Sequence, residues 1–164
     1  MKKWPSLLFA SSLVVCGVAS AKNIVQTAKD AGQFTILLKA AAATGMDKTL
    51  AEPGPYTVFA PTDAAFNALP PGMLDKLMQP QNRDMLKKVL GYHTLFGRLT
   101  TRDLKNPKSA AATTIGAPVI LEMKNGGVMV NGARITQPDI PADNGVIHVI
   151  DKVLLPATPI QPKT

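Results

Sequence analysis

The spacing of hydrophobic residues changes once along this chain, and that change limits the folds it can adopt. In the first half, apolar residues recur at helical spacing, as in Phe34, Leu37, Leu38 and Ala41. In the second half, short apolar runs are separated by turn signals such as Asn125-Gly126. We predict strands at residues 56–60, 110–115, 118–123, 128–131, 133–137 and 146–150. Helices followed by strands at hairpin distances predict an α+β domain with mostly antiparallel pairing.

The stretch YTVFAPTDAAF, residues 56–66, predicts a strand followed at once by a helix. Pro61 ends the strand and holds the residue before it extended. Thr62 or Asp63 then offers an oxygen to the unpaired amides of the helix, a cap worth about 0.5–2 kcal/mol. We therefore interpret Thr62 and Asp63 as structural residues.

The N-terminal residues have the pattern of a cleaved signal peptide, which we place at residues 1–21. A basic start precedes an apolar run over residues 7–15, and an Ala-Ser-Ala cleavage site follows at residues 19–21. The apolar run is too short to span a bilayer. Cys16 leaves an alternative, in which cleavage in front of it is coupled to lipidation.

Cleavage after Ala21 leaves one domain, residues 22–156, and a proline-containing tail at 157–164. This mature chain has no cysteine and no predicted transmembrane segment, so packing alone must hold it together, and we expect a monomer. The full chain has a net charge of +7, but its basic residues are scattered. Because nucleic-acid binding requires clustered basic residues, we do not expect a nucleic-acid partner.

The mature chain offers few groups for catalysis or metal binding. Its one serine, Ser109, lies outside any nucleophile motif, and its two histidines, His93 and His148, lie in separate segments without zinc-ligand spacing. We therefore predict no catalytic residues, no metal and no cofactor. A hydrolase would require Asp63, His93 or His148 to converge in a cleft, and no spacing argument supports that.

The two histidines have different local contexts. His148 shares a strand face with Val146 and Ile150, so we predict a hydrogen-bonded core residue. Tyr92 and His93 begin a predicted extended stretch, where neighbouring side chains point to opposite faces. One of them would face the core and the other a surface or a partner. The pair is therefore either a junction between the two halves of the domain or a recognition site.

Asp139 and Ile140 lie between two prolines, Pro138 and Pro141. The prolines make this segment stiff and extended, and we expect that it cannot be an inner strand of a sheet. An exposed loop with one acidic and one aliphatic tip is either a docking element or a plain connection.

Three motifs in this order resemble the fasciclin-like (FAS1) domain family. Residues 56–66 resemble its first conserved block, Tyr92-His93 its central Tyr-His motif, and residues 144–156 its second block. The resemblance covers about residues 23–156. With one domain behind a signal peptide, the chain is similar to small secreted bacterial members of the family. It implies a β-wedge or sandwich with several short helices along one side. It also implies extracellular adhesion or matrix interaction, with partner-binding residues at Tyr92, His93, Asp139 and Ile140.

We therefore expect a secreted, non-enzymatic module, periplasmic or at the cell surface. Its partners would be cell-surface or matrix proteins or polysaccharides in the envelope or extracellular matrix. An alternative is a periplasmic carrier of a small apolar or haem-like ligand, because Tyr92 and His93 are residue types that can ligate haem iron.

Overall fold

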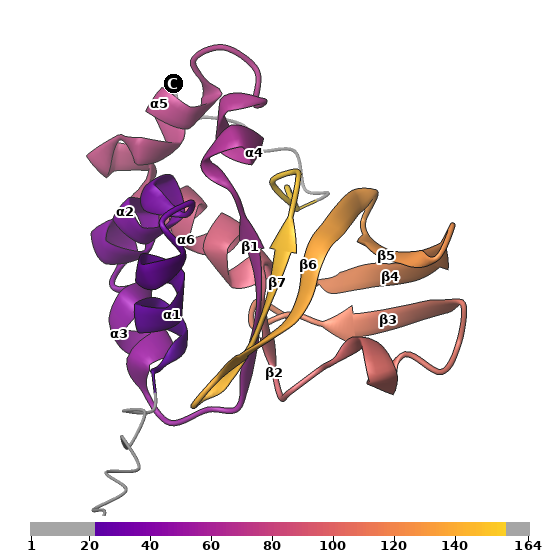
Figure 1. The fold of residues 1–164 in the computed structure, drawn as a ribbon. Helices are drawn as coiled ribbons and strands as arrows, with labels where there is room; N and C mark the ends of the chain where they lie inside the picture. Colours follow the sequence, from indigo (N-terminus) through magenta and orange to yellow (C-terminus); the bar gives the residue numbers. More distant parts are fainter. Residues whose placement is uncertain (1–21, 157–164) are drawn as a thin grey trace, which may run out of the picture.

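The computed structural model describes residues 22–156 (Figure 1). The predicted signal peptide at residues 1–21, with Cys16, and the predicted tail at residues 157–164 lie outside the described residues. Within residues 22–156, no helix combines the length and the hydrophobicity needed to cross a bilayer.

Short helices cover one side of the domain and one of its ends. In Figure 1, α1, α2, α3 and α6 lie along the face of β1 and β7, while α4 and α5 lie at the end where β1 finishes. The helices are α1 (Ile24–Ala31), α2 (Thr35–Thr44), α3 (Met46–Ala51), α4 (Asp63–Asn67), α5 (Met73–Met78) and α6 (Arg83–Tyr92). Two 3-10 turns, η1 (Pro80–Asn82) and η2 (Thr101–Asp103), complete the helical parts.

Seven strands form one sheet in the order β2-β1-β7-β6-β5-β4-β3. Only β1 and β7 run parallel; every other neighbouring pair is antiparallel. A bridge between Leu95 and Thr113 joins the two ends of this order, so the sheet nearly closes. The predicted α+β class with mostly antiparallel strands is confirmed. The strands are β1 (Tyr56–Pro61), β2 (Thr94–Phe96), β3 (Lys108–Ala112), β4 (Pro118–Lys124), β5 (Gly127–Val130), β6 (Ala133–Ala142) and β7 (Gly145–Ile150).

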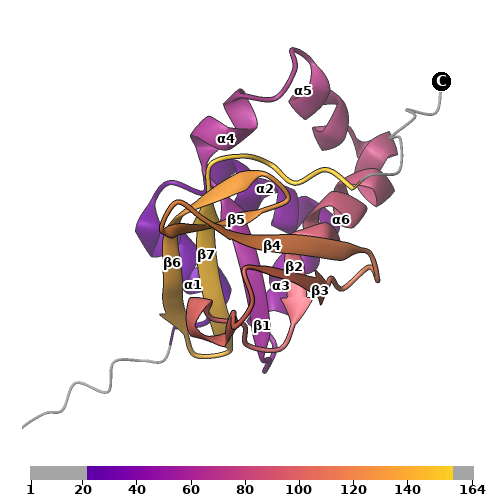
Figure 2. The same ribbon diagram turned by 90° about the vertical axis from the view of Figure 1, so that its right-hand side faces the viewer.

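The central strands are buried on both faces, which gives the domain two hydrophobic cores. Val58 and Ile147 pack against the helices, whereas Phe59 and Ile150 pack against residues of β4 and β5. Figure 2 shows β4 and β5 crossing in front of β1 and β7. Burial on both faces explains why β7 reads as a continuous apolar run rather than an alternating one.

Two of the three Asn-Gly dipeptides of the second half, Asn125-Gly126 and Asn131-Gly132, form tight hairpin turns with positive φ angles. Asn125 and Gly126 have φ of 52° and 76°, and Asn131 and Gly132 have φ of 46° and 82°. Two successive positive φ angles define the turn type that matches the twist of a hairpin, and Asn-Gly is its preferred sequence. The hairpin predicted at Asn125 is therefore confirmed.

The expectation that Pro138 and Pro141 exclude an inner strand is wrong. Both prolines lie in β6, which pairs with β7 on one side and with β5 on the other. The prolines are tolerated because β5 pairs only with Ala133 and Arg134, at the start of β6. The β6–β7 register also shifts at two places around Gln137, and Asp139 has a φ of 55° there.

Thr62 and Asp63 are both caps, but of different helices. The Thr62 hydroxyl accepts a hydrogen bond from the Ala65 amide at 3.3 Å and caps α4, as the sequence predicts. The Asp63 carboxylate instead accepts one from the Ile36 amide at 2.8 Å. Ile36 lies in the first turn of α2, whose own N-cap residue, Phe34, makes no capping bond with its side chain. Asp63 therefore joins α2 to the end of β1.

We expect Asp63→Ala to lower the free energy of unfolding by about 1 kcal/mol, because it removes this cap. The melting temperature should fall by several degrees in a thermal scan followed by circular dichroism. Asp75→Ala is the matched control, since Asp75 is exposed in the first turn of α5 and the same charge is removed. Equal melting temperatures for the two variants would contradict the capping role of Asp63.

Candidate functional site: a groove beside His148

His148 is buried at the centre of the sheet and bonds to two segments outside the ladders. It is 2% exposed, and its ring stacks on Phe59 with 5.6 Å between the ring centroids. Its Nδ1 accepts a hydrogen bond from the Asp139 amide at 3.1 Å, and its Nε2 lies 2.7 Å from the Leu99 carbonyl oxygen. The predicted hydrogen-bonded core histidine is confirmed.

These partners fix the protonation of His148. A backbone amide can only donate and a carbonyl can only accept, so Nδ1 carries no proton and Nε2 carries one. Burial lowers the pKa of His148, while the bond to Leu99 and the charge of Asp139 raise it in part. The ring is therefore neutral at pH 7, and its role is structural.

Asp139 links this network to the loop that contains η2. Its carboxylate accepts hydrogen bonds from the Thr101 amide at 2.8 Å and from the Thr101 hydroxyl. Leu99, two residues earlier, donates its amide proton to the Thr57 hydroxyl at 2.8 Å. Thr57 and His148 thus hold both backbone groups of Leu99, and Asp139 holds Thr101. The segment from Leu99 to Thr101 is fastened to β1, β6 and β7.

An open groove of about 780 Å³ lies beside this network, between the β4–β5 hairpin and β6. We call it the β5–β6 groove. Thr101 and Pro138 line one side, and Val128 and residues of the Asn125 turn line the other. The groove begins where β6 leaves β5, after the pair of Met129 and Arg134. It is therefore shaped by the same bulged segment that His148 and Asp139 hold.

The structure overturns the prediction that Tyr92 and His93 are extended. Tyr92 is the last residue of α6, and His93 keeps helical dihedral angles, with φ of −86° and ψ of −4°. Successive side chains on a helix differ in direction by about 100° rather than 180°, so both can turn inward. They are 5% and 2% exposed, and neither faces a surface.

Tyr92 joins α6 to β4 and to the turn that follows β5. Its hydroxyl lies 3.2 Å from the Pro118 carbonyl oxygen and accepts a hydrogen bond from the Asn131 amide group at 2.6 Å. The Asn131 side chain also accepts a bond from the Ile120 amide. Tyr92 thereby fixes β4 and the turn after β5. These bonds give Tyr92 the first of its two predicted roles, a junction between the helical half and the sheet, rather than that of an exposed recognition site.

His93 joins the end of α6 to the segment that follows β7. Its Nε2 accepts a hydrogen bond from the Leu154 amide at 2.8 Å, and its Nδ1 donates to the Val89 carbonyl oxygen at 2.7 Å. Burial lowers the pKa of His93 to about 4, and the Val89 carbonyl opposes that shift. Neutral His93 therefore carries its proton on Nδ1, whereas neutral His148 carries its proton on Nε2.

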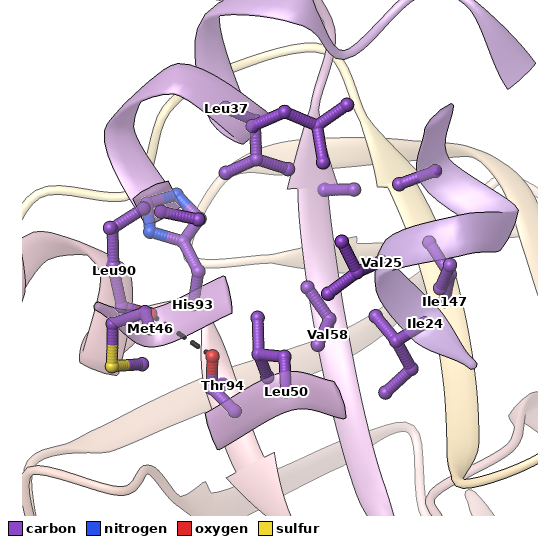
Figure 3. A pocket seen from close by; sticks show the side chains of 14 residues that line it. Ile24, Val25, Leu37, Met46, Leu50, Val58, Leu90, His93, Thr94 and Ile147 are labelled. Atoms are coloured by element: carbon purple, nitrogen blue, oxygen red, sulfur yellow. Dashed lines mark hydrogen bonds between the residues drawn. The ribbon is translucent and has the colours of Figure 1, made fainter. Parts of the chain in front are cut away.

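His93 also borders a small apolar cavity between the helices and the sheet. Figure 3 shows Leu37, Leu50, Val58 and Ile147 around this space, with His93 at its side. The cavity has a volume of about 30 Å³, enough for about one water molecule and far too small for haem. Both nitrogens of His93 and the hydroxyl of Tyr92 are already hydrogen-bonded. The geometry gives no support to the haem-carrier alternative.

The remaining candidate residues do not gather into a catalytic or metal site. Asp63 bonds to α2, while the two histidines bond to backbone groups in different parts of the core. Among the described residues, no three side chains of His, Cys, Asp or Glu are grouped closely enough to hold a metal ion. Ile140 is half-buried against the helix-side core, opposite Ile147 of β7.

Asn144 is a buried structural residue whose role the sequence analysis missed. Its side chain accepts a hydrogen bond from the Ile24 amide at 2.9 Å and donates to the Leu50 and Glu52 carbonyl oxygens at 2.6 Å and 2.8 Å. It thus ties α1 and α3 to the β6–β7 turn. The Asn144-Gly145 dipeptide was visible as a turn signal, but these partners are more than 90 residues away.

The fold and these motifs agree with a known family. The family model of the Fasciclin domain matches residues 32–156. The chain belongs to the fasciclin domain family. The resemblance inferred from residues 56–66, Tyr92-His93 and residues 144–156 is confirmed.

Relatives of this fasciclin domain come from bacteria and animals. It is 41% identical to Protein sll1483 of Synechocystis sp. over 84% of this chain and 75% of that protein. It is 36% identical to rabbit (Oryctolagus cuniculus) transforming growth factor-beta-induced protein ig-h3, over 82% of this chain but only 19% of that protein. A solved FAS1 domain pair from the insect cell adhesion molecule fasciclin I superposes with a TM-score of 0.73 at 20% identity, over 82% of this chain and 51% of that one. That likeness shows the shared fold.

The neutral state of His93 predicts a specific dependence of stability on pH. Because its pKa falls from 6.5 to about 4 on folding, the unfolded chain binds a proton more readily between those values. The stability from neutral His93 is fully present above about pH 6.5 and is lost as the pH falls toward about 4, a loss on the order of 3 kcal/mol. Urea unfolding between pH 7 and pH 5 measures the upper part of this loss.

His93→Leu should be less stable at pH 7 by about 2 kcal/mol or more, since it leaves the Leu154 amide and the Val89 carbonyl unpaired. Its stability should nevertheless change less between pH 7 and pH 5 than that of the wild type. Tyr92→Phe is the matched control, because it loses hydrogen bonds at the same junction and keeps the wild-type pH dependence. A pH dependence unchanged in His93→Leu would contradict the assignment.

Proposed function

We propose that this fasciclin domain is an exported, non-enzymatic interaction module, which binds protein or polysaccharide partners in the cell envelope or the extracellular matrix. The observation that carries the proposal is that the side chains most able to do chemistry, two histidines and two aspartates, are bonded to backbone groups of the domain. His93 and His148 bind backbone groups through both ring nitrogens, and Asp63 and Asp139 bind backbone amides. These side chains therefore stabilise the fold. The β5–β6 groove beside them is an open surface to which a partner can bind.

Two further observations support this function. The solved structure with the same fold comes from a protein named as a cell adhesion molecule. The N-terminal sequence has the pattern of an export signal. Residues 22–156 contain no cysteine, so their folding does not depend on the redox state of the compartment. We expect the protein in the periplasm, at the cell surface or in the medium.

The partner-binding residues expected from the sequence take different roles in this proposal. Asp139 is partly exposed and holds Thr101, which lines the β5–β6 groove. Ile140, Tyr92 and His93 are wholly or partly buried, and they support binding by holding the strands that carry the surface. Asp139 is therefore the member of this set whose substitution affects binding most directly.

Beads coated with the domain should retain envelope fragments from the source organism. Treatment of the fragments with protease or with periodate distinguishes a protein partner from a polysaccharide. Asp139→Ala should reduce retention several-fold, whereas Asp75→Ala on α5 should not, and circular dichroism confirms that both are folded. Retention no greater than that of albumin-coated beads, or a protein found only in the cytoplasm on fractionation, would contradict the proposal.

A further inference from the structure

Aromatic side chains are exposed at the end of the domain where β1 begins. Phe96, the last residue of β2, is 70% exposed, more than any other large hydrophobic side chain within residues 22–156. It pairs in register with Tyr56 of β1, and the two ring centroids lie 6.0 Å apart. Pro53 and Pro55, in the loop before β1, are also exposed. Exposed apolar side chains that gather in one place mark a binding surface, whereas single ones need no explanation.

An open hollow of about 450 Å³ lies next to Tyr56. Its walls include residues 53–55, Arg98 and Asp143. The Tyr56 ring lies against the same loop, because a Cβ atom on Gly54 would come within 3.0 Å of Tyr56 Cδ2. In Figure 1, the start of β1, the end of β2 and the β6–β7 turn lie together at the lower end of the domain. The two rings and the hollow therefore form one surface, which we call the β1-end surface.

Hydrogen bonds hold the backbone that carries this surface in place. The Gly97 amide donates to the Pro55 carbonyl oxygen at 2.9 Å, and the Gly97 carbonyl oxygen accepts from the Thr57 hydroxyl at 2.7 Å. Gly97 has a φ of 95°, in the region that favours glycine, so the chain turns before Arg98. Arg98 thereby reaches the β6–β7 turn and donates to the Ala142 carbonyl oxygen at 3.3 Å. A surface fixed in this way loses little conformational entropy when a ligand binds.

The polar groups of the hollow include both charges and are free to bind a ligand. One N–H of Arg98 is bonded to a carbonyl, and its other N–H groups have no partner in the part of the chain that the structure describes. The exposed Asp143 carboxylate likewise bonds to none of those residues. The Lys22 carbonyl accepts from the Asp143 amide, but the Lys22 amine pairs with Asp30. Glu52, exposed in the loop before β1, adds a second carboxylate. The surface thus offers donors and acceptors without an excess of positive charge.

We propose that the β1-end surface binds a neutral polysaccharide built of β-linked glucose units. Such a sugar ring carries its hydroxyl groups equatorially, so each face presents C–H groups that pack on the negative face of an aromatic ring. Phe96 and Tyr56 supply these rings, and hydroxyls at the sugar's edge meet Arg98 and Asp143. The volume of the hollow lies within the range of ligand pockets, about 300–1,000 Å³. This surface is separate from the β5–β6 groove, so the inference goes beyond the site considered for the proposed function.

Charge and hydrogen bonding distinguish this ligand from three others. A uronic-acid polymer would bring carboxylates toward Asp143 and Glu52. A lipid surface would cover Phe96, but placing Arg98 and Asp143 against hydrocarbon is costly. A proline-rich peptide also docks on aromatic rings, but proline has no backbone N–H to donate to Asp143. A neutral sugar satisfies the rings, the guanidinium and the carboxylate together.

The test titrates cellohexaose and laminarihexaose, two neutral β-glucan oligosaccharides, into the isotope-labelled domain by NMR. We expect saturable shifts of amide signals that cluster at residues 54–57, 96–98 and 143–145. Polygalacturonate and decaproline represent an acidic polysaccharide and a proline-rich peptide. Both should bind ~10-fold more weakly or worse, because they leave Asp143 repelled or unpaired.

Phe96→Ala should weaken binding of the hexasaccharides ~10-fold or more, because it removes a stacking ring. Phe96→Tyr restores a ring and should bind within ~3-fold of the wild type, whereas Asp143→Ala should bind ~3-fold more weakly or worse. Met123→Ala is the matched control, since Met123 is also an exposed apolar side chain, at 51%, but lies near the end of β4. It should bind as the wild type does. Thermal melts show which variants are folded, and if one is not, the map of shifted signals and the comparison with polygalacturonate decide the matter with wild-type protein.

The inference is wrong if neither hexasaccharide shifts these signals, or if Phe96→Ala binds them as the wild type does. Tighter binding of polygalacturonate or decaproline at the same residues would also overturn it. Retention of envelope fragments tests the proposed function separately. Equal retention by the wild type and Phe96→Ala, without hexasaccharide binding, would mean an interaction module whose site lies elsewhere. Hexasaccharide binding without any retention of fragments would contradict the proposed function and keep the sugar site.

Discussion

The imidazole of His148 holds together the irregular part of this fold. It lies on a strand that is buried on both faces, and its two nitrogens bind backbone groups of Asp139 and Leu99. Regular pairing leaves no partner for backbone groups at a bulge or in a buried loop, and an unpaired buried group is costly. By satisfying both, His148 stabilises the displaced course of β6. The β5–β6 groove exists because β6 takes that course.

Local features of the fold could be read from the sequence, and long-range contacts could not. Asn125-Gly126 determines its turn through its own φ angles, and Thr62 caps the helix that begins at the next residue. Asp63, by contrast, caps a helix that begins 28 residues earlier, which no spacing rule indicates. The prolines of β6 were misinterpreted for the same reason, because their tolerance depends on where β5 stops pairing. Tyr92 and His93 were placed in an extended stretch, whereas α6 includes Tyr92 and His93 keeps helical dihedral angles.

The candidate site was predicted in part. The sequence pointed to Asp139 and to the stiffness of its segment. Pro138 of that segment lines the groove, and Asp139 holds Thr101, which also lines it. The sequence also pointed to Tyr92 and His93, which are buried. Tyr92 bonds to β4 and to the turn after β5, and His93 bonds to the segment after β7. The sequence did not indicate Lys124, Arg134 or Thr101, because these residues have no motif and come together only through the separation of β5 and β6. In this domain polar side chains shape a surface, and the surface rather than a reactive group carries the proposed function.

The protonation of the two histidines tests this account most directly. Nitrogen-15 NMR of the imidazole rings at pH 7 reports which nitrogen carries the proton. The hydrogen bonds to Leu154 and Asp139 require opposite neutral tautomers, with the proton on Nδ1 of His93 and on Nε2 of His148. Both ring protons should exchange slowly with water. Charged rings, or a rapid mixture of tautomers at either position, would contradict the claim that these side chains are fixed parts of the scaffold.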